Sequence, residues 1–184
     1  MKKTFLLAIG LLSLLMGLAP IAAADNDDSS NTGSSPSPWY LGTGLGVDIP
    51  AQDWNPDFPI GGTANLFSGC HLSPTFSLQL SVIPTFFTGN GLSVADLRVS
   101  PELRWMSFPG GVDPYFLLGP GFDFQFASPS GYSTSSFAAL GGIGFQFDLR
   151  PGEHAFIESR YYFLIYKNIT QEDVPILVGL SEDL

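Results

Sequence analysis

The chain has 184 residues, of which 45% are hydrophobic, 14% aromatic and only 13% charged. This charged fraction is well below the roughly 25% of an ordinary soluble domain, so something other than water is expected to cover much of the surface. The 17 acidic and 7 basic residues give a net charge of −10. That balance opposes nucleic-acid binding, which rests on Lys and Arg meeting phosphates, and a single cysteine excludes an intramolecular disulfide framework.

The first 24 residues are ordered like a secretory signal peptide. Lys2 and Lys3 precede an apolar run over residues 5–21, and residues 22–24 are three alanines before a polar stretch. Cleavage after residue 24 is predicted, with a retained membrane anchor as the alternative. It leaves 5 basic and 17 acidic residues, a net charge of −12. Residues 25–37 are acidic and Ser-rich, which predicts a disordered leader.

From Trp39 onward the sequence is a series of alternating polar and apolar segments separated by turn residues. No helical period is sustained, and no run of about 18 apolar residues follows the signal, so no transmembrane helix is predicted. Residues 49–59, 128–135 and 167–173 are expected to form longer loops. The predicted strands cover 38–48, 60–71, 75–88, a fourth segment around 97–105, 114–126, 137–149, 157–165 and 174–184.

Alternation gives each strand two chemically different faces. Between Leu97 and Trp105 the odd positions are apolar, whereas the even positions are Arg98, Ser100, Glu102 and Arg104. Across the strands the polar face holds arginines and carboxylates but no lysine. A solvated face normally carries Lys and Glu, whereas a crowded lumen favours Arg paired with carboxylates. The polar face is therefore predicted to point inward.

The dimensions favour a membrane barrel. An apolar stripe of about 9 to 12 residues, at about 3.3 Å per residue and about 40° of tilt, spans roughly 25 Å, the height of the apolar band of an outer-membrane barrel. Turns near Ser73, Gly110 and Gly152 are short, as periplasmic turns are. The predicted fold is an all-β, eight-stranded antiparallel up-and-down transmembrane β-barrel over residues 38–184.

Three groups of candidate residues follow from this orientation. The lumen charge network is predicted to contain Asp96, Arg98, Glu102, Arg104, Asp123, Asp148, Glu158 and Arg160. The lipid-facing and girdle residues are Trp39, Val99, Leu103, Trp105, Phe122, Phe124, Phe145 and Phe163. The exposed loop groups are Asp53, Trp54, Asp57, Tyr132, Glu172 and Asp173. We interpret the network as a plug, with a gate or ion path as the alternative, because an eight-stranded barrel is just wide enough for its side chains.

Three prolines do not fit the pattern easily. Pro84, Pro101 and Pro120 lie inside predicted strands, and each removes a ladder donor where unpaired backbone groups are costly. Bulges are the expected way to accommodate them. The prolines are the best argument for a soluble periplasmic barrel instead.

Four stretches carry a resemblance: Trp39–Gly46 (WYLGTGLG), Asp113–Phe122 (DPYFLLGPGF), Phe156–Tyr162 (FIESRYY) and Val174–Leu180 (VPILVGL). With the strands laid out, residues 38–184 resemble the small outer-membrane β-barrel family of OmpA/OmpX type. The resemblance implies a barrel in the bacterial outer membrane that contacts lipid and lipopolysaccharide and is inserted by the barrel-assembly machinery. A monomer is expected. Members usually end in Phe after alternating apolar residues, and here Glu182 and Leu184 depart from that signal.

The leading hypothesis is a non-enzymatic protein with a structural or surface-interaction role through its loops, without cofactor or metal. A narrow channel for small or apolar solutes is one alternative. A lipopolysaccharide-modifying acyl hydrolase or transferase is another, and it needs a His able to deprotonate a Ser at the lipid-facing rim. The two histidines, His71 and His154, are instead predicted at periplasmic turns.

Overall fold

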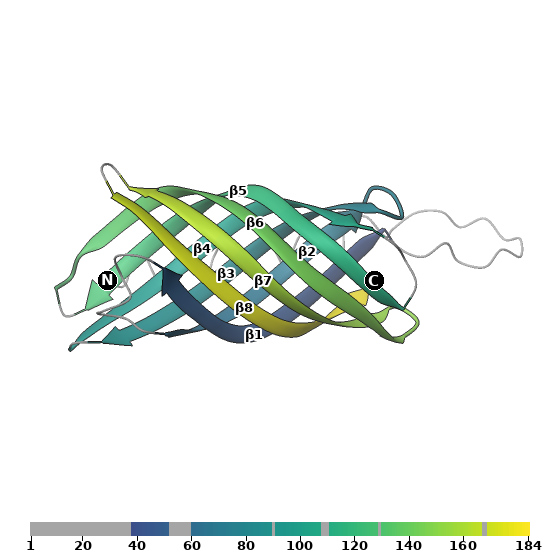
Figure 1. Ribbon diagram of the computed structural model, residues 1–184, viewed down its shortest axis with the longest axis horizontal. Helices are drawn as coiled ribbons and strands as arrows, with labels where there is room; N and C mark the ends of the chain where they lie inside the picture. The colour runs from purple at the N-terminus through teal and green to yellow at the C-terminus, as the bar shows by residue number, and fades with distance from the viewer. Residues whose placement is uncertain (1–37, 52–59, 90, 108–110, 129, 167–168) are drawn as a thin grey trace, which may run out of the picture. The chain divides into compact units, whose positions relative to one another are not determined.

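A computed structural model shows a closed barrel of eight antiparallel strands (Figure 1). It describes residues 38–51, 60–89, 91–107, 111–128, 130–166 and 169–184, so the predicted signal peptide and leader lie outside the described residues. The strands are β1 (Trp39–Ala51), β2 (Gly61–His71), β3 (Phe76–Gly89), β4 (Leu92–Met106), β5 (Val112–Ser128), β6 (Ser133–Arg150), β7 (Glu153–Tyr166) and β8 (Ile169–Asp183). Within the described residues, no helix is long and apolar enough to cross a membrane.

Each strand pairs with its neighbours in sequence, and β1 pairs with β8 to close the barrel. Because the strands run up and down, Trp39 and Leu184 lie at one end, which we call the terminal end, with the β2–β3, β4–β5 and β6–β7 turns. The other end, which we call the loop end, carries the remaining connections. In Figure 1 the terminal end lies where the yellow end of the chain is marked C.

The strands are longer than predicted at the loop end. β1 continues to Ala51 and β8 begins at Ile169, and the two strands pair from Asp48↔Pro175 to Ala51↔Glu172. Similarly, β6 begins at Ser133, inside a predicted loop. The expected loops over 49–59, 128–135 and 167–173 are therefore too long. Polar composition led to the prediction of loops at these positions, but the lumen-facing and rim positions of a strand are as polar as a loop.

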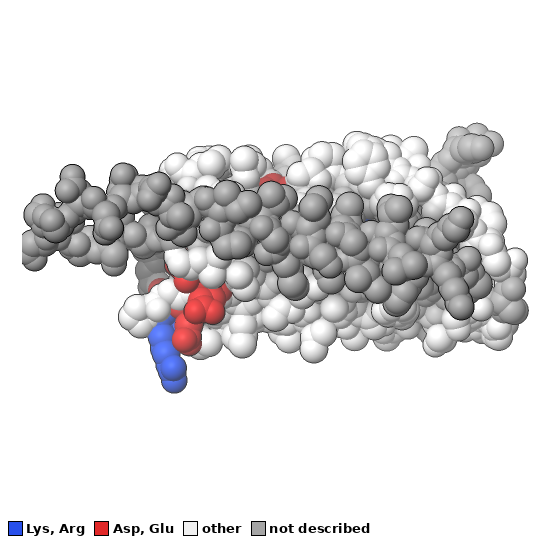
Figure 2. All heavy atoms as spheres, turned by 180° about the vertical axis from the view of Figure 1, so that it is seen from behind, with Lys and Arg blue, Asp and Glu red and all other residues white. Residues whose placement is uncertain are grey.

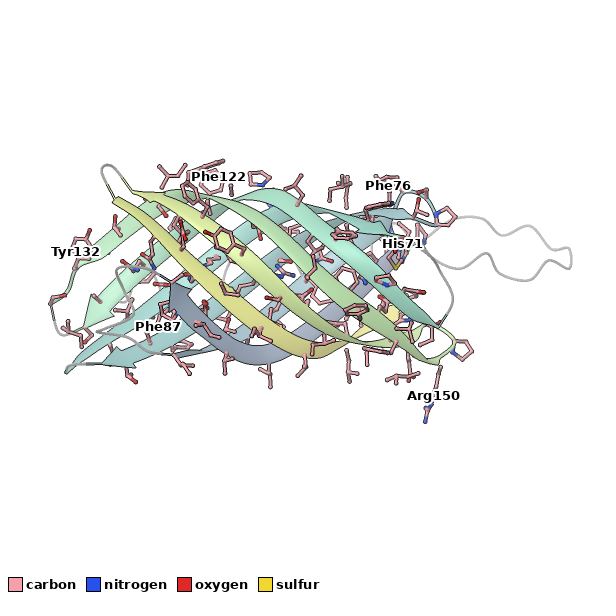
Figure 3. All side chains as sticks on the ribbon, in the orientation of Figure 1. His71, Phe76, Phe87, Phe122, Tyr132 and Arg150 are labelled. Atoms are coloured by element: carbon pink, nitrogen blue, oxygen red, sulfur yellow. The ribbon has the colours of Figure 1, made fainter. Side chains whose placement is uncertain are left out.

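The barrel wall is apolar outside and polar inside. Leu45 and Leu118 are 67% and 68% exposed, whereas Arg98 and Asp123 are 1% and 0% exposed. Figure 2 shows few charged atoms on the visible wall, with most of those gathered at one end. Figure 3 shows Phe76 and Phe122 pointing away from the wall. The eight predicted lipid-facing residues all lie on this outer face: Trp39, Val99, Leu103, Trp105, Phe122, Phe124, Phe145 and Phe163.

Aromatic rings fill the lumen over glycines of adjacent strands. A Cβ on Gly42 would collide with the ring of Phe67, which is 7% exposed. The rings of Tyr40 and Tyr115 lie in the same way over glycines of β2 and β6. Phe67 is an apolar residue at an inward-facing position of β2, and its ring fits inside because the glycine opposite, Gly42, makes room for it.

The prolines are accommodated without bulges, contrary to expectation. Pairing of β4 with β5 stops after Val99↔Phe122 and resumes in the same register at Leu103↔Leu118. That register places Pro101 opposite Pro120, so the two residues without an N–H share one interruption. Pro84 lies in a similar interruption between Thr63↔Thr85 and Leu66↔Val82. Because Pro101 and Pro120 lie opposite each other, fewer backbone carbonyl groups lose a hydrogen-bond donor than if each proline faced a different residue.

A close approach of strands makes one glycine a sensitive position. A Cβ on Gly119 would collide with the carbonyl oxygen of Pro101 on the adjacent strand. We expect Gly119→Ala to lower the free energy of unfolding by about 1–3 kcal/mol, because backbone must shift to admit the methyl group. Urea unfolding of the refolded protein measures this. The control is Gly62→Ala, whose Cβ would meet nothing within 4 Å. Equal losses from both changes would contradict the crowding.

Candidate functional site

The lumen at the loop end is organised around Arg98 of β4. Its guanidinium donates from Nε to Asp123 (3.2 Å), from Nη1 to Asp48 (2.9 Å), and from Nη2 to Asp96 (3.3 Å) and Asp173 (2.6 Å). We call these five residues the Arg98 cluster. All five are at most 2% exposed. They come from β1, β4, β5 and β8. The cluster therefore connects β1 and β8, the two strands that pair to close the barrel, with β4 and β5.

A second group of charges lies next to it in the lumen. Arg160 donates from Nη1 to Glu102 (2.6 Å) and from Nε to Glu158 (2.8 Å). Each carboxylate also accepts neutral donors: Gln79, Ser81 and Ser100 for Glu102, and Asn65 and Tyr115 for Glu158. The ring of Tyr162 connects the two groups, because the Arg98 guanidinium lies 4.9 Å from its centre and Arg160 bonds its hydroxyl at 3.4 Å.

Arg104 forms a third layer toward the terminal end. Its Nη2 donates to the Gln146 side chain at 2.5 Å, and its guanidinium lies 4.0 Å from the centre of the Tyr115 ring and 6.0 Å from that of Tyr40. Stacked guanidinium and aromatic groups exclude water as well as bind one another. Together the three layers hold charged groups and aromatic rings that are almost entirely buried inside the barrel.

Of the eight residues predicted for the lumen network, seven are buried in these layers: Asp96, Arg98, Glu102, Arg104, Asp123, Glu158 and Arg160. Asp148 is not one of them. Its side chain is 49% exposed at the terminal end, where it accepts a bond from His154 Nδ1 at 2.7 Å. The parity of Asp148 suited the lumen, but the residue lies at the end of β6, where the register against β7 shifts between Asp148 and Arg150.

Asp173, predicted as an exposed loop group, is instead a lumen residue bonded to Arg98. Asp48 also belongs to the network, although sequence reasoning did not propose it. In both cases the alternation of side chains along the strand indicates the inward position. Asp48 shares the inward parity of Tyr40, and Asp173 shares that of Leu177.

The other predicted loop groups are placed differently from one another. Tyr132 is 58% exposed at the loop end (Figure 3). Glu172 is half-buried in β8 and points to the outer face, not into a loop. Asp53, Trp54 and Asp57 lie outside the described residues.

The terminal end holds both histidines. The Nε2 atoms of His71 and His154 lie 3.4 Å and 3.5 Å from the two carboxylate oxygens of Asp183, and His71 Nδ1 lies 2.9 Å from Ser77 Oγ. Ser77, His71 and Asp183 thus form a hydroxyl–imidazole–carboxylate row, which is the order of groups in a serine nucleophile site. Ser77 is 1% exposed and faces the lumen, however, away from the outer wall. In the described part of the chain, no group of three or more His, Cys, Asp or Glu residues is placed to hold a metal ion.

Comparison of the structure with solved structures gives the class of fold. The barrel is similar to the Neisserial surface protein A, with a TM-score of 0.65 and 11% identity over 82% of this chain and 100% of that one. The fold is that of the small outer-membrane β-barrels. This barrel is also similar to OprG of Pseudomonas aeruginosa, with a TM-score of 0.56 and 11% identity over 81% of this chain and 97% of that one.

The N-terminal β-barrel domain of Pseudomonas aeruginosa OprF is a further match, with a TM-score of 0.55 and 15% identity over 80% of this chain and 99% of that one. No family model and no curated protein matches the sequence. The predicted eight-stranded up-and-down barrel is confirmed at the level of the fold. At these identities the similarity concerns the fold alone.

Proposed function

We propose that this chain is a non-enzymatic protein of the bacterial outer membrane, with a plugged lumen and a structural or surface-interaction role through its loop end. The proposal rests on the distribution of polar and apolar residues, which is reversed relative to a soluble barrel: the outer wall is apolar and the interior is charged. Leu118 on the wall is 68% exposed, whereas Arg98 and Arg160 inside are 1% exposed. In water such a wall is a large apolar patch that promotes association, but in a bilayer it is the expected lipid-facing surface.

The partners that follow are the lipids around the wall, lipopolysaccharide at the rim and the barrel-assembly machinery during insertion. Each protomer closes its own sheet, because β1 pairs with β8. A monomer is therefore sufficient to satisfy the strand edges.

Location is tested by fractionating cells that express the full chain and by gel migration of heated and unheated samples. We expect the protein with the outer membrane and a faster-migrating folded form in unheated samples. Recovery as a soluble periplasmic protein would overturn the proposal.

The plug distinguishes this role from that of a channel for small or apolar solutes. Glu102 and Arg160 contact each other at 2.6 Å in the lumen, and both are at most 2% exposed. Opening a water-filled path requires breaking such bonds and separating buried charges, which is costly. Refolded protein in planar bilayers is expected to give no stable openings. Sustained conductance above that of protein-free bilayers would favour the channel.

The Ser77–His71–Asp183 row supports a second candidate, an acyl hydrolase. Burial of Ser77 makes this candidate the weaker one, because an acyl substrate must reach the hydroxyl. We expect no release of fatty acid from lipopolysaccharide by the refolded protein. Release that disappears in both Ser77→Ala and His71→Gln would replace the non-enzymatic role, whereas release that survives substitution of both histidines excludes a His-dependent enzyme.

A further inference from the structure

The Arg98 cluster contains more carboxylates than its cation can neutralise. One guanidinium faces four aspartates, each with an oxygen within 3.3 Å of it. Fully ionised, Asp48, Asp96 and Asp173 alone exceed the charge of Arg98 by two negative units, in a site that is at most 2% exposed. An unpaired buried carboxylate is far less stable than its neutral form or than one paired with a cation.

The hydrogen-bond inventory shows the same excess. A guanidinium has five N–H donors, whereas four carboxylates offer eight acceptor oxygens. In Asp48, Asp96 and Asp173 the second oxygen, Oδ1, is buried and has no hydrogen-bond partner. Buried acceptors are normally hydrogen-bonded, so three carboxylate oxygens without a donor in one cluster indicate that an additional donor binds there.

The neighbouring group of Arg160, Glu102 and Glu158 does not offset this excess, because it has two carboxylates for one guanidinium and its ion pairs are internal. The described lumen-facing residues that line the cluster from β2, β3 and β6 include the neutral Thr63, Thr85 and Ser136. From β7 the facing titratable group is Tyr162, whose ring lies against Arg98. Gln125, paired with Asp96 across β4 and β5, is also neutral and leaves the charge excess unchanged. Among the described residues, then, the cluster has one guanidinium and four carboxyls, and the nearest charged group, around Arg160, adds no net positive charge.

We propose that the Arg98 cluster is a proton-binding site, in which neighbouring aspartates share protons at neutral pH. A bound proton removes one negative charge and converts a carboxylate into a donor that bonds the free oxygen of a neighbour. A metal ion would also bring positive charge, but the described acidic groups are not placed to hold one. Loss of the protons at high pH restores repulsion between strands β1, β4, β5 and β8, so the loop end loses stability as the pH rises.

Infrared spectroscopy of the refolded protein in phosphatidylcholine bilayers tests the protonation directly. We expect absorption from a protonated carboxyl group at pH 7 that weakens in Asp173→Asn, because the amide replaces one proton-sharing partner with an isosteric neutral group. The matched control is Glu153→Gln, which changes a carboxylate that is 48% exposed at the terminal end. That change is expected to leave the absorption as it is.

Proton uptake during folding provides a second measurement that does not depend on a spectral assignment. Refolding in weakly buffered solution with a pH indicator is expected to consume protons, and Asp173→Asn is expected to consume about one fewer per chain. Absence of a protonated-carboxyl signal in the wild type, or equal uptake by wild type and Asp173→Asn, would overturn the proposal. So would a bound metal ion in the purified protein whose removal by chelator lowers the unfolding midpoint.

Discussion

Replacing Arg98 by methionine is expected to lower the free energy of unfolding by about 3–5 kcal/mol or to prevent folding at neutral pH. Methionine keeps much of the length and apolar stem but removes the guanidinium that bonds Asp48, Asp96, Asp123 and Asp173. Four carboxyls would remain in the lumen without their cation, and each would have to take up a proton or open the barrel to water. Urea unfolding in phosphatidylcholine bilayers, followed by gel migration of unheated samples, measures the loss.

The matched control is Arg150→Met, because Arg150 is 77% exposed and lies 4.0 Å from Glu153 at the terminal end. An exposed pair of this kind contributes about 0–1 kcal/mol, so Arg150→Met is expected to unfold nearly like the wild type. Mild acid is expected to recover part of the stability of Arg98→Met, since protonation neutralises the orphaned aspartates. If Arg98→Met unfolds at the wild-type urea concentration, the cluster does not hold the loop end together.

Alternation along each strand predicted the fold and the orientation of the wall, because a side-chain period of two is local information. Between Leu97 and Trp105 every polar residue faces the lumen and every apolar residue lies on the outer wall. The same rule would have found Asp48, the last residue of the predicted strand 38–48, and, extended by one residue, Asp173. Asp173 was missed because the start of the last strand was predicted where the sequence becomes apolar, although a polar residue in this barrel also suits the lumen.

Features that depend on which strands meet could not be predicted from a single strand. Phe67 lies inside only because Gly42 on β1 leaves room for its ring. Pro101 and Pro120 are compatible with the sheet because the register of β4 and β5 brings them opposite each other. Asp148 has the parity of a lumen residue but lies too close to the end of β6 to be enclosed. The register between strands and the position of a residue along the barrel axis are set by the closed sheet, so the pattern of one strand does not reveal them.

A lysine at position 99 is expected to destabilise the barrel by about 2–4 kcal/mol in a bilayer, the cost of a cation near the midplane on the lipid-facing wall. Val99 lies at the middle of β4, on the outer face, between Val82 of β3 and Phe122 of β5. Unfolding of Val99→Lys in phosphatidylcholine bilayers measures the effect. The control is Leu72→Lys in the β2–β3 turn, where the side chain is 59% exposed at the terminal end and a lysine can reach water.

Comparing Arg98→Met with Val99→Lys shows which face of β4 points into the barrel. The comparison also shows that any loss of stability depends on that face and not on a general intolerance of altered charge. At position 98 removal of a positive charge is destabilising, whereas at position 99 addition of one is destabilising, although the two residues are adjacent in β4. Only a strand with carboxylates on one face and hydrocarbon on the other produces opposite signs one residue apart. A soluble barrel with this fold would accept Val99→Lys on a hydrated wall, so wild-type stability of that variant in bilayers would reverse the assignment of inside and outside.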